Sequence, residues 1–180
     1  VVTDARMRGQ LDEIVLEINA ESSDAYEKAR LIIDYVHSYI PNWVYMKKPF
    51  YLIGRFSYYL EPPFICVRLS DPYNAPLFAL STGCGSCMEY SLVYREIAHA
   101  TGLTVRSVHA PGEDHNWDEV LINGTWIVVD PINRKFDVKP EKIKPCRGSI
   151  CANFSYVFGV YPNGTTVNLT HRYTNTSTLV

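Results

Sequence analysis

Hydrophobic residues in the N-terminal part of the chain recur at spacings of three and four, which places them on one face of a helix. One such stripe covers residues 11–18, and a second covers residues 29–40. Asp24 offers an N-cap for the second helix, and Glu27 follows three positions later, as in a capping box. Pro41 ends the pattern, because proline cannot continue a helix. Residues 1–40 are therefore predicted to form a helical N-terminal part.

The following segment, residues 41–80, lacks a sustained hydrophobic period and is rich in tyrosine, phenylalanine and proline. We expect irregular structure here, with one short strand near Phe64–Leu69, and a role in framing a cleft or covering the core. A helical pattern returns over Met88–Thr101, and Gly102 suits the position just past its end.

Beyond this helix the pattern changes to that of short strands, rich in β-branched and aromatic residues and separated by turn residues. These segments are residues 103–108, 116–122, 125–129, 155–160 and 166–170. Asn123-Gly124, between the second and third of them, is a strong signal for a tight hairpin. Helices followed by an antiparallel sheet predict an α+β fold.

Composition fits one globular domain over residues 1–180. The chain is 47% hydrophobic and 20% charged, and its formal net charge is −2. Lysine and arginine are scattered rather than grouped, so we expect no nucleic-acid partner. No apolar stretch is long enough for a membrane helix, so we also expect no direct membrane insertion.

Two features favour an extracellular or cell-surface setting. Five Asn-x-Ser/Thr acceptor sequences for N-glycosylation begin at residues 123, 153, 163, 168 and 175, although the last quarter of the chain is rich in these residues anyway. The five cysteines fit two disulfides and one free thiol, with Cys146 and Cys151 as one candidate pair. The chain begins without methionine, so we expect a processed product or a domain of a longer protein.

The stretch STGCGSCMEYS carries the most informative chemistry. Cys87 stands at the start of a predicted helix, where unpaired backbone N–H groups favour a thiolate, and Gly83 and Gly85 allow a tight turn into that helix. A buried structural cysteine is the alternative interpretation of this position.

His115 and Asp130 add a second and third group to this candidate site. His115 begins one strand of the predicted hairpin and Asp130 ends the other, so counting back from Asn123-Gly124 places both at the open end of the ribbon. A cysteine at a helix start, with a histidine and an aspartate on neighbouring strand ends, is an arrangement of nucleophile, base and orienting group. His109 is the rival histidine.

GSCMEYS, DHNWDEV and WIVVDP, in this order, resemble the Cys, His, Asp signature of the transglutaminase-like superfamily, whose core is papain-like. YNAPLFAL before the cysteine, and SYVF and VNLTHRY near the end, make the peptide:N-glycanase branch the most similar by motif. By motif order the resemblance spans roughly residues 25–174, with a catalytic core expected over residues 81–174 and a tail at 175–180.

The resemblance implies catalytic roles for Cys87 as nucleophile, His115 as general base and acid, and Asp130 as orienting group. It implies acyl transfer through a thioester, on a peptide, protein or glycoprotein substrate and without a cofactor. Glu89 is expected to be a helix-start carboxylate rather than a catalyst. The chain departs from the glycanase branch in lacking its two N-terminal Cys-x-x-Cys pairs and in carrying Met88, which leaves the substrate open.

Several alternatives stay open from the residues. A zinc site could use the cysteines at positions 84, 87, 146 and 151, and a redox Cys-x-x-Cys pair is another interpretation. Cys84 could instead pair with Cys66 or be buried. At the level of function, the alternatives to a thiol hydrolase are an amine-accepting transglutaminase and a non-catalytic binding module that retains the fold.

Overall fold

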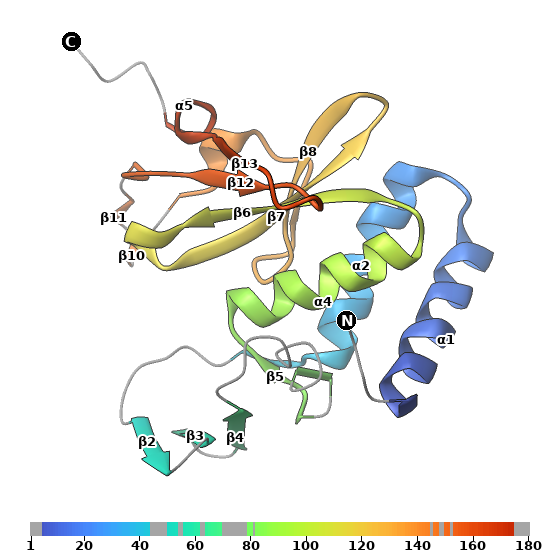
Figure 1. The fold of residues 1–180 in the computed structure, drawn as a ribbon, viewed down its shortest axis with the longest axis vertical. Coiled ribbons are helices and arrows are strands. Elements are labelled where there is room, and N and C mark those ends of the chain that lie inside the picture. Colours follow the sequence, from blue (N-terminus) through green and yellow to red (C-terminus); the bar gives the residue numbers. More distant parts are fainter. Residues whose placement is uncertain are drawn as a thin grey trace.

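A layer of helices covers one face of an antiparallel sheet in the computed structural model (Figure 1). The structure describes residues 5–43, 50–53, 56–61, 64–69, 79–80, 82–144, 146–147, 150–151 and 153–174. The helices are α1 (Ala5–Glu21), α2 (Ala25–Tyr39), α4 (Cys87–Ala100) and the short α5 (Thr170–Tyr173), with 3-10 turns at Pro111–Glu113 and Pro140–Lys142.

The predicted helices are confirmed, and their ends follow local chemistry. Asp24 is the N-cap of α2, and its Oδ1 accepts a hydrogen bond from the Glu27 amide at 2.8 Å. α2 packs on α4 through buried tyrosines, since the Tyr94 hydroxyl donates to the carbonyl of Ala29 at 3.0 Å. Gly102 follows α4 with a φ of +86°, the left-handed conformation that glycine adopts easily.

The main sheet has the strand order β13-β12-β6-β7-β8-β9. Its strands are β6 (Thr104–Ala110), β7 (His115–Ile122), β8 (Thr125–Asp130), β9 (Lys135–Phe136), β12 (Phe158–Val160) and β13 (Thr166–Asn168). Asn123 and Gly124 both have positive φ between β7 and β8, which is the geometry of the predicted tight hairpin. The α+β class expected from the sequence is therefore confirmed.

The prediction of mostly irregular structure between residues 41 and 80 was wrong in part. β4 (Phe64–Leu69) is the expected strand, but it belongs to a separate antiparallel sheet in which β3 (Phe56–Glu61) pairs with β4 on one side and with β2 (Phe50–Ile53) on the other. Aromatic residues favour strands even where polar and apolar residues do not alternate. A search for alternation therefore did not reveal β2 and β3. Residues 44–49 and 70–78 lie outside the described part, so the expected role in framing a cleft stays a prediction.

Two further pairs of short strands complete the described structure. β1 (Asn42–Trp43) runs parallel to β5 (Cys84–Gly85), directly before α4. β10 (Cys146–Arg147) is antiparallel to β11 (Ile150–Cys151), and their register sets Cys146 opposite Cys151. A disulfide between these two cysteines stays a prediction, as does the tail at 175–180, which lies outside the described residues.

The sheet buries side chains on both of its faces. The helix-facing core joins the stripes of α1, α2 and α4 to Val120 and Ile122 of β7, and the other face packs Trp117 against Phe154 and Tyr173. Alternation along β7 thus sends successive side chains to opposite cores. Within the described residues, no helix combines the length and apolar character needed to span a membrane.

Candidate active site

Cys87 is the first residue of α4, and the residues before it set this position. Ser86 is the N-cap, and Glu89 Oε2 accepts hydrogen bonds from the Ser86 amide at 2.8 Å and the Ser86 hydroxyl at 2.5 Å. A Cβ at Gly85 would lie 2.9 Å from the Glu89 Cβ, so a larger residue there would push this capping contact apart. Glu89 is thus a capping carboxylate, and α4 presents its unpaired backbone N–H groups beside Cys87.

The two cysteines of the motif have different surroundings. Cys84 is buried at 3% exposure and is disulfide-bonded, whereas Cys87 is partly exposed and has a free thiol. Cys87 Sγ lies 3.8 Å from Asn116 Nδ2 and 3.9 Å from the carbonyl oxygen of Asp114. Cys87 is therefore the sulfur that is available for chemistry at the start of α4.

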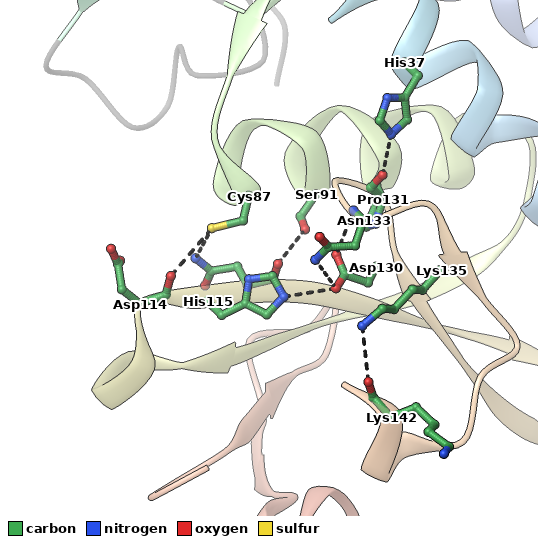
Figure 2. Close-up of polar contacts among 11 residues, drawn as sticks. His37, Cys87, Ser91, Asp114, His115, Asp130, Pro131, Asn133, Lys135 and Lys142 are labelled. Atoms are coloured by element: carbon green, nitrogen blue, oxygen red, sulfur yellow. Dashed lines mark hydrogen bonds and ion pairs between the residues drawn. The ribbon is translucent and has the colours of Figure 1, made fainter. Parts of the chain in front are cut away.

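His115 and Asp130 meet across the β7–β8 hairpin, as counting from the turn predicted. His115 Nε2 lies 3.1 Å from Asp130 Oδ2, with the aspartate fully buried and the histidine side chain 17% exposed. Asp118 of β7 pairs with Val129 of β8, so these two side chains point to the same face of the sheet. Asp130, one residue after Val129, and His115, three residues before Asp118, therefore both point to the opposite face. In Figure 2, His115 lies between the sulfur of Cys87 and the carboxylate of Asp130.

The electrostatics of the site favour a charged imidazole. Burial alone would lower the pKa of His115, but hydrogen bonds and charge interactions with Asp130 and Cys87 outweigh it and raise the pKa to about 9. Trp117 stacks beside the ring, with centroids 5.3 Å apart. At neutral pH the imidazole is accordingly protonated and faces a sulfur on one side and a carboxylate on the other.

Two residues that the sequence analysis did not single out hold the aspartate and its turn. Asn133 donates from Nδ2 to Asp130 Oδ2 at 2.8 Å, and His37 of α2 contacts the carbonyl of Pro131 through Nε2 at 2.7 Å (Figure 2). The Asp-Pro-x-Asn spacing is a turn signal that could have indicated Asn133. No local pattern links His37 to this turn, because the two lie 94 positions apart.

The rival histidine does not contact the sulfur directly. His109 Nδ1 lies 2.5 Å from Asn116 Oδ1, and its Nε2 lies 2.9 Å from Ser107 Oγ. Its link to Cys87 therefore runs through the Asn116 amide, which the sequence analysis also did not single out.

The helix face of β7 carries a further buried carboxyl near the site. Asp118 is fully buried, and its Oδ1 lies 3.0 Å from Arg95 Nε of α4. Burial raises the pKa of Asp118 to about 7, and the Arg95 charge and a Ser91 hydrogen bond only partly oppose this rise. This carboxyl supports the packing of α4 on β7.

The described residues offer no grouping of three or more histidine, cysteine, aspartate or glutamate side chains suited to a metal ion. The zinc alternative would need the side chains of Cys146 and Cys151, which lie outside the described part.

Comparison with known proteins identifies the family. Residues 12–131 match the family model described as the transglutaminase-like superfamily, and the chain belongs to this superfamily. The α+β fold, with helices followed by an antiparallel sheet, agrees with this membership. No curated protein sequence matches the chain.

Solved structures show the same fold at low identity. One is a Rad4–Rad23 crystal structure bound to a 6-4 photoproduct UV lesion, at 14% identity and a TM-score of 0.58, covering 82% of this chain and 36% of that chain. Another, from a study of β-hairpin motifs in DNA duplex opening by the Rad4/XPC nucleotide excision repair complex, has 15% identity and a TM-score of 0.58, covering 95% of this chain and 45% of that chain. The chain thus spans less than half the length of these matched chains.

These structures correct one expectation. The scattered charge led us to exclude a nucleic-acid partner, yet chains of the same fold occur in Rad4–Rad23 structures bound to a UV lesion and crosslinked to undamaged DNA. Net charge describes a whole domain, whereas phosphate contacts depend on the placement of a few side chains. A net charge of −2 therefore does not exclude DNA for a chain of this fold.

Proposed function

We propose that this protein is a cysteine-dependent amide hydrolase or acyl transferase that works through a thioester. One observation carries the proposal: the His115 imidazole interacts with both the Asp130 carboxylate and the free thiol of Cys87. A nucleophile, a proton carrier and a group that orients the carrier are the three parts that thiol acyl transfer needs. Membership of the transglutaminase-like superfamily supports the same chemistry.

In the proposed reaction, the Cys87 thiolate attacks the carbonyl carbon of an amide and forms a tetrahedral intermediate. The backbone N–H of Cys87, at the start of α4, is placed to stabilise the developing oxyanion. Protonated His115 then donates its proton to the leaving amine as the C–N bond breaks, which leaves a thioester. Neutral His115 next takes a proton from water, the hydroxide attacks the thioester, and the acid and the Cys87 thiolate are released.

Asp130 and Asn133 give His115 a fixed orientation in this scheme. The carboxylate accepts the Nε2–H of His115 and leaves the other ring nitrogen for the sulfur and the substrate. The Asn133 amide donates to the same carboxylate oxygen, which restricts its rotation. His37 acts one step further away by holding the turn after Asp130.

For the substrate, we propose an amide in a peptide or glycoprotein, as in the peptide:N-glycanase branch that the motifs resemble. An amine in place of water would give the transglutaminase reaction from the same thioester. An extracellular setting is part of the proposal, and it is supported by four acceptor asparagines that are exposed: Asn123, Asn153, Asn163 and Asn168.

The first test is brief treatment with iodoacetamide across pH, followed by mass spectrometry of the labelled peptides. We expect Cys87 to react faster than a model thiol near neutral pH. The second test is incubation with an N-linked glycopeptide and with the matching unglycosylated peptide, with and without a labelled amine. Released glycan, cleaved amide or amine incorporation that disappears in Cys87→Ala would support the proposal and name the reaction.

The outcome that overturns the proposal is equally definite. Alkylation of Cys87 no faster than that of a model thiol, together with equal activity of wild type and Cys87→Ala, would remove the enzymatic role.

A second candidate function is a non-catalytic module that binds DNA. The fold shared with chains of the Rad4–Rad23 structures supports it, since those complexes are bound to a 6-4 photoproduct UV lesion or crosslinked to undamaged DNA. Fluorescence anisotropy with a labelled duplex, intact or carrying a mismatch, tests this candidate at several salt concentrations. Binding that is equal in wild type and Cys87→Ala, without any amide chemistry, would favour it over the enzyme.

A further inference from the structure

Besides His115 and Asp130, a chain of hydrogen-bonded side chains leads to Cys87 along the helix-facing side of the sheet. This polar run consists of Asn116, His109 and Ser107. Asn116 follows His115 in β7, so its side chain points to the opposite face of the strand, toward the start of α4. Its Nδ2 lies 3.8 Å from Cys87 Sγ, and its Oδ1 lies 2.5 Å from His109 Nδ1. His109 Nε2 in turn lies 2.9 Å from Ser107 Oγ.

The partners of this run fix which end of the Asn116 amide faces the sulfur. With Oδ1 accepting the Nδ1–H of His109, the Nδ2 group is left to donate toward Cys87. A histidine that carries its proton on Nδ1 presents Nε2 as an acceptor, which suits the Ser107 hydroxyl. All the bonds of the run thus have one consistent direction.

Packing holds His109 in this orientation and in this protonation state. His109 stands opposite Asn116 on β7 and opposite Phe158 on β12, and the Phe158 ring stacks on the imidazole with centroids 5.1 Å apart. Burial lowers the pKa of His109, the nearby Arg95 charge also lowers it, and the hydrogen bond with Asn116 opposes them. The neutral His109 ring, whose Nε2 accepts from Ser107, is therefore the favoured form at neutral pH.

We propose that Asn116 is a positioning residue for the nucleophile, with His109 acting through it. An N–H donor stabilises a thiolate more strongly than a thiol, since hydrogen bonds to ionised acceptors are the stronger ones. The carbonyl of Asp114, 3.9 Å from the same sulfur, accepts from S–H and favours the thiol. The Asn116 amide has the opposite effect: its N–H favours the Cys87 thiolate, as the positive charge of His115 also does. The inference rests on the proposed role of Cys87 as nucleophile.

The test compares the pH profile of Cys87 alkylation by iodoacetamide in wild type and variants, with folding checked by circular dichroism. In Asn116→Asp the donor becomes a negatively charged acceptor of the same shape. Because a hydrogen bond to a charged group is stronger than one between neutral groups, we expect alkylation at pH 7 to fall by about tenfold or more, and the profile to move to higher pH. Asn163→Asp, at an exposed turn residue, is the matched control and should leave the profile unchanged.

A second pair of variants covers the case in which Asn116→Asp does not fold. His109→Gln retains an N–H that can donate to Asn116 Oδ1, whereas His109→Leu frees the amide to rotate. We expect a profile near wild type for His109→Gln and slower alkylation for His109→Leu. Profiles that superimpose for every folded variant, with fast wild-type alkylation, would overturn this inference alone. Slow alkylation of the wild type as well, together with equal amide-cleaving activity of wild type and Cys87→Ala, would overturn the proposed function along with it.

Discussion

The imidazole of His37 in α2 lies 2.7 Å from the carbonyl oxygen of Pro131, the residue after the buried carboxylate of the candidate site. This contact ties the turn that follows β8 to the helical layer. His37 also packs against the Tyr90 ring of α4, with centroids 5.0 Å apart. One side chain thus joins α2, α4 and the end of the strand that carries Asp130.

Replacing His37 should therefore loosen the Asp130 turn without touching the reacting groups. We expect His37→Phe to lower the free energy of unfolding by about 1 kcal/mol, the usual contribution of one hydrogen bond, and to slow Cys87 alkylation modestly. Urea unfolding and the alkylation assay measure the two effects. His171→Phe, at an exposed position of α5, serves as a control. Equal effects of the two substitutions would contradict the role given to His37.

Removing the charge of Asp130 should lower the pKa of His115 from about 9, because the aspartate supplies both a hydrogen bond and a negative charge. We expect this for Asp130→Asn, and NMR titration of the histidine resonances measures it, with exposed His171 as an internal reference. A His115 pKa that stays near 9 in Asp130→Asn would assign the shift to Cys87 instead.

The same pKa shift has a consequence for stability. The folded-state pKa of His115 lies above the ordinary value of about 6.5, so folding favours the protonated ring. This contribution is fully present below about pH 6.5 and is lost as the pH rises through about 9. We expect the difference in unfolding free energy between wild type and Asp130→Asn to shrink across this window, as measured by urea unfolding at several pH values.

The sequence predicted the parts of the fold that depend on local periods. The stripes of α2 and α4 and the Asn123-Gly124 turn are signals carried by neighbouring residues, and the structure forms them where the pattern indicated. The hairpin then placed His115 close to Asp130, because pairing from a tight turn is simple counting. The paired strands β2 and β3 escaped detection because they depend on partners rather than on a period.

The supporting shell of the site could not be predicted in this way. Asn116 follows His115, yet its role depends on its side chain pointing to the other face and on His109 standing opposite it. His37 reaches Pro131 only after α2 has packed on the sheet. Catalytic roles for Cys87, His115 and Asp130 stay predictions that the experiments above test.

Asp118 should make the stability of the protein fall as the pH rises toward neutrality. Its folded-state pKa of about 7 lies above the ordinary value of about 3.8, so the native state binds the proton more tightly than the unfolded chain does. The native state is then penalised progressively between about pH 4 and pH 7. We expect Asp118→Asn to gain stability relative to wild type over this window, while Asp12→Asn, at an exposed residue of α1, tracks wild type. A constant difference across these pH values would contradict the shift.

Glu119 should be the most costly single carboxylate to remove from the sheet. It is fully buried, and its oxygens accept hydrogen bonds from Arg106 Nε, Arg172 Nε and the Tyr173 hydroxyl, each at 2.7 Å. Glu119→Ala would leave Arg106, whose side chain is only 5% exposed, without its carboxylate partner.

Removing one partner of a buried ion pair costs about 3–5 kcal/mol, so we expect a loss of this size in urea unfolding of Glu119→Ala. Glu13→Ala, at an exposed position of α1, should change the unfolding free energy by less than about 0.5 kcal/mol. Because Arg172 and Tyr173 belong to α5, we also expect hydrogen exchange in α5 to become faster than in wild type when Glu119 is removed, while exchange in α1 stays unchanged. A loss below about 1 kcal/mol, with unchanged exchange in α5, would show that the stacking of Arg106 on Trp126, at 4.2 Å from the ring centroid, suffices to hold the guanidinium.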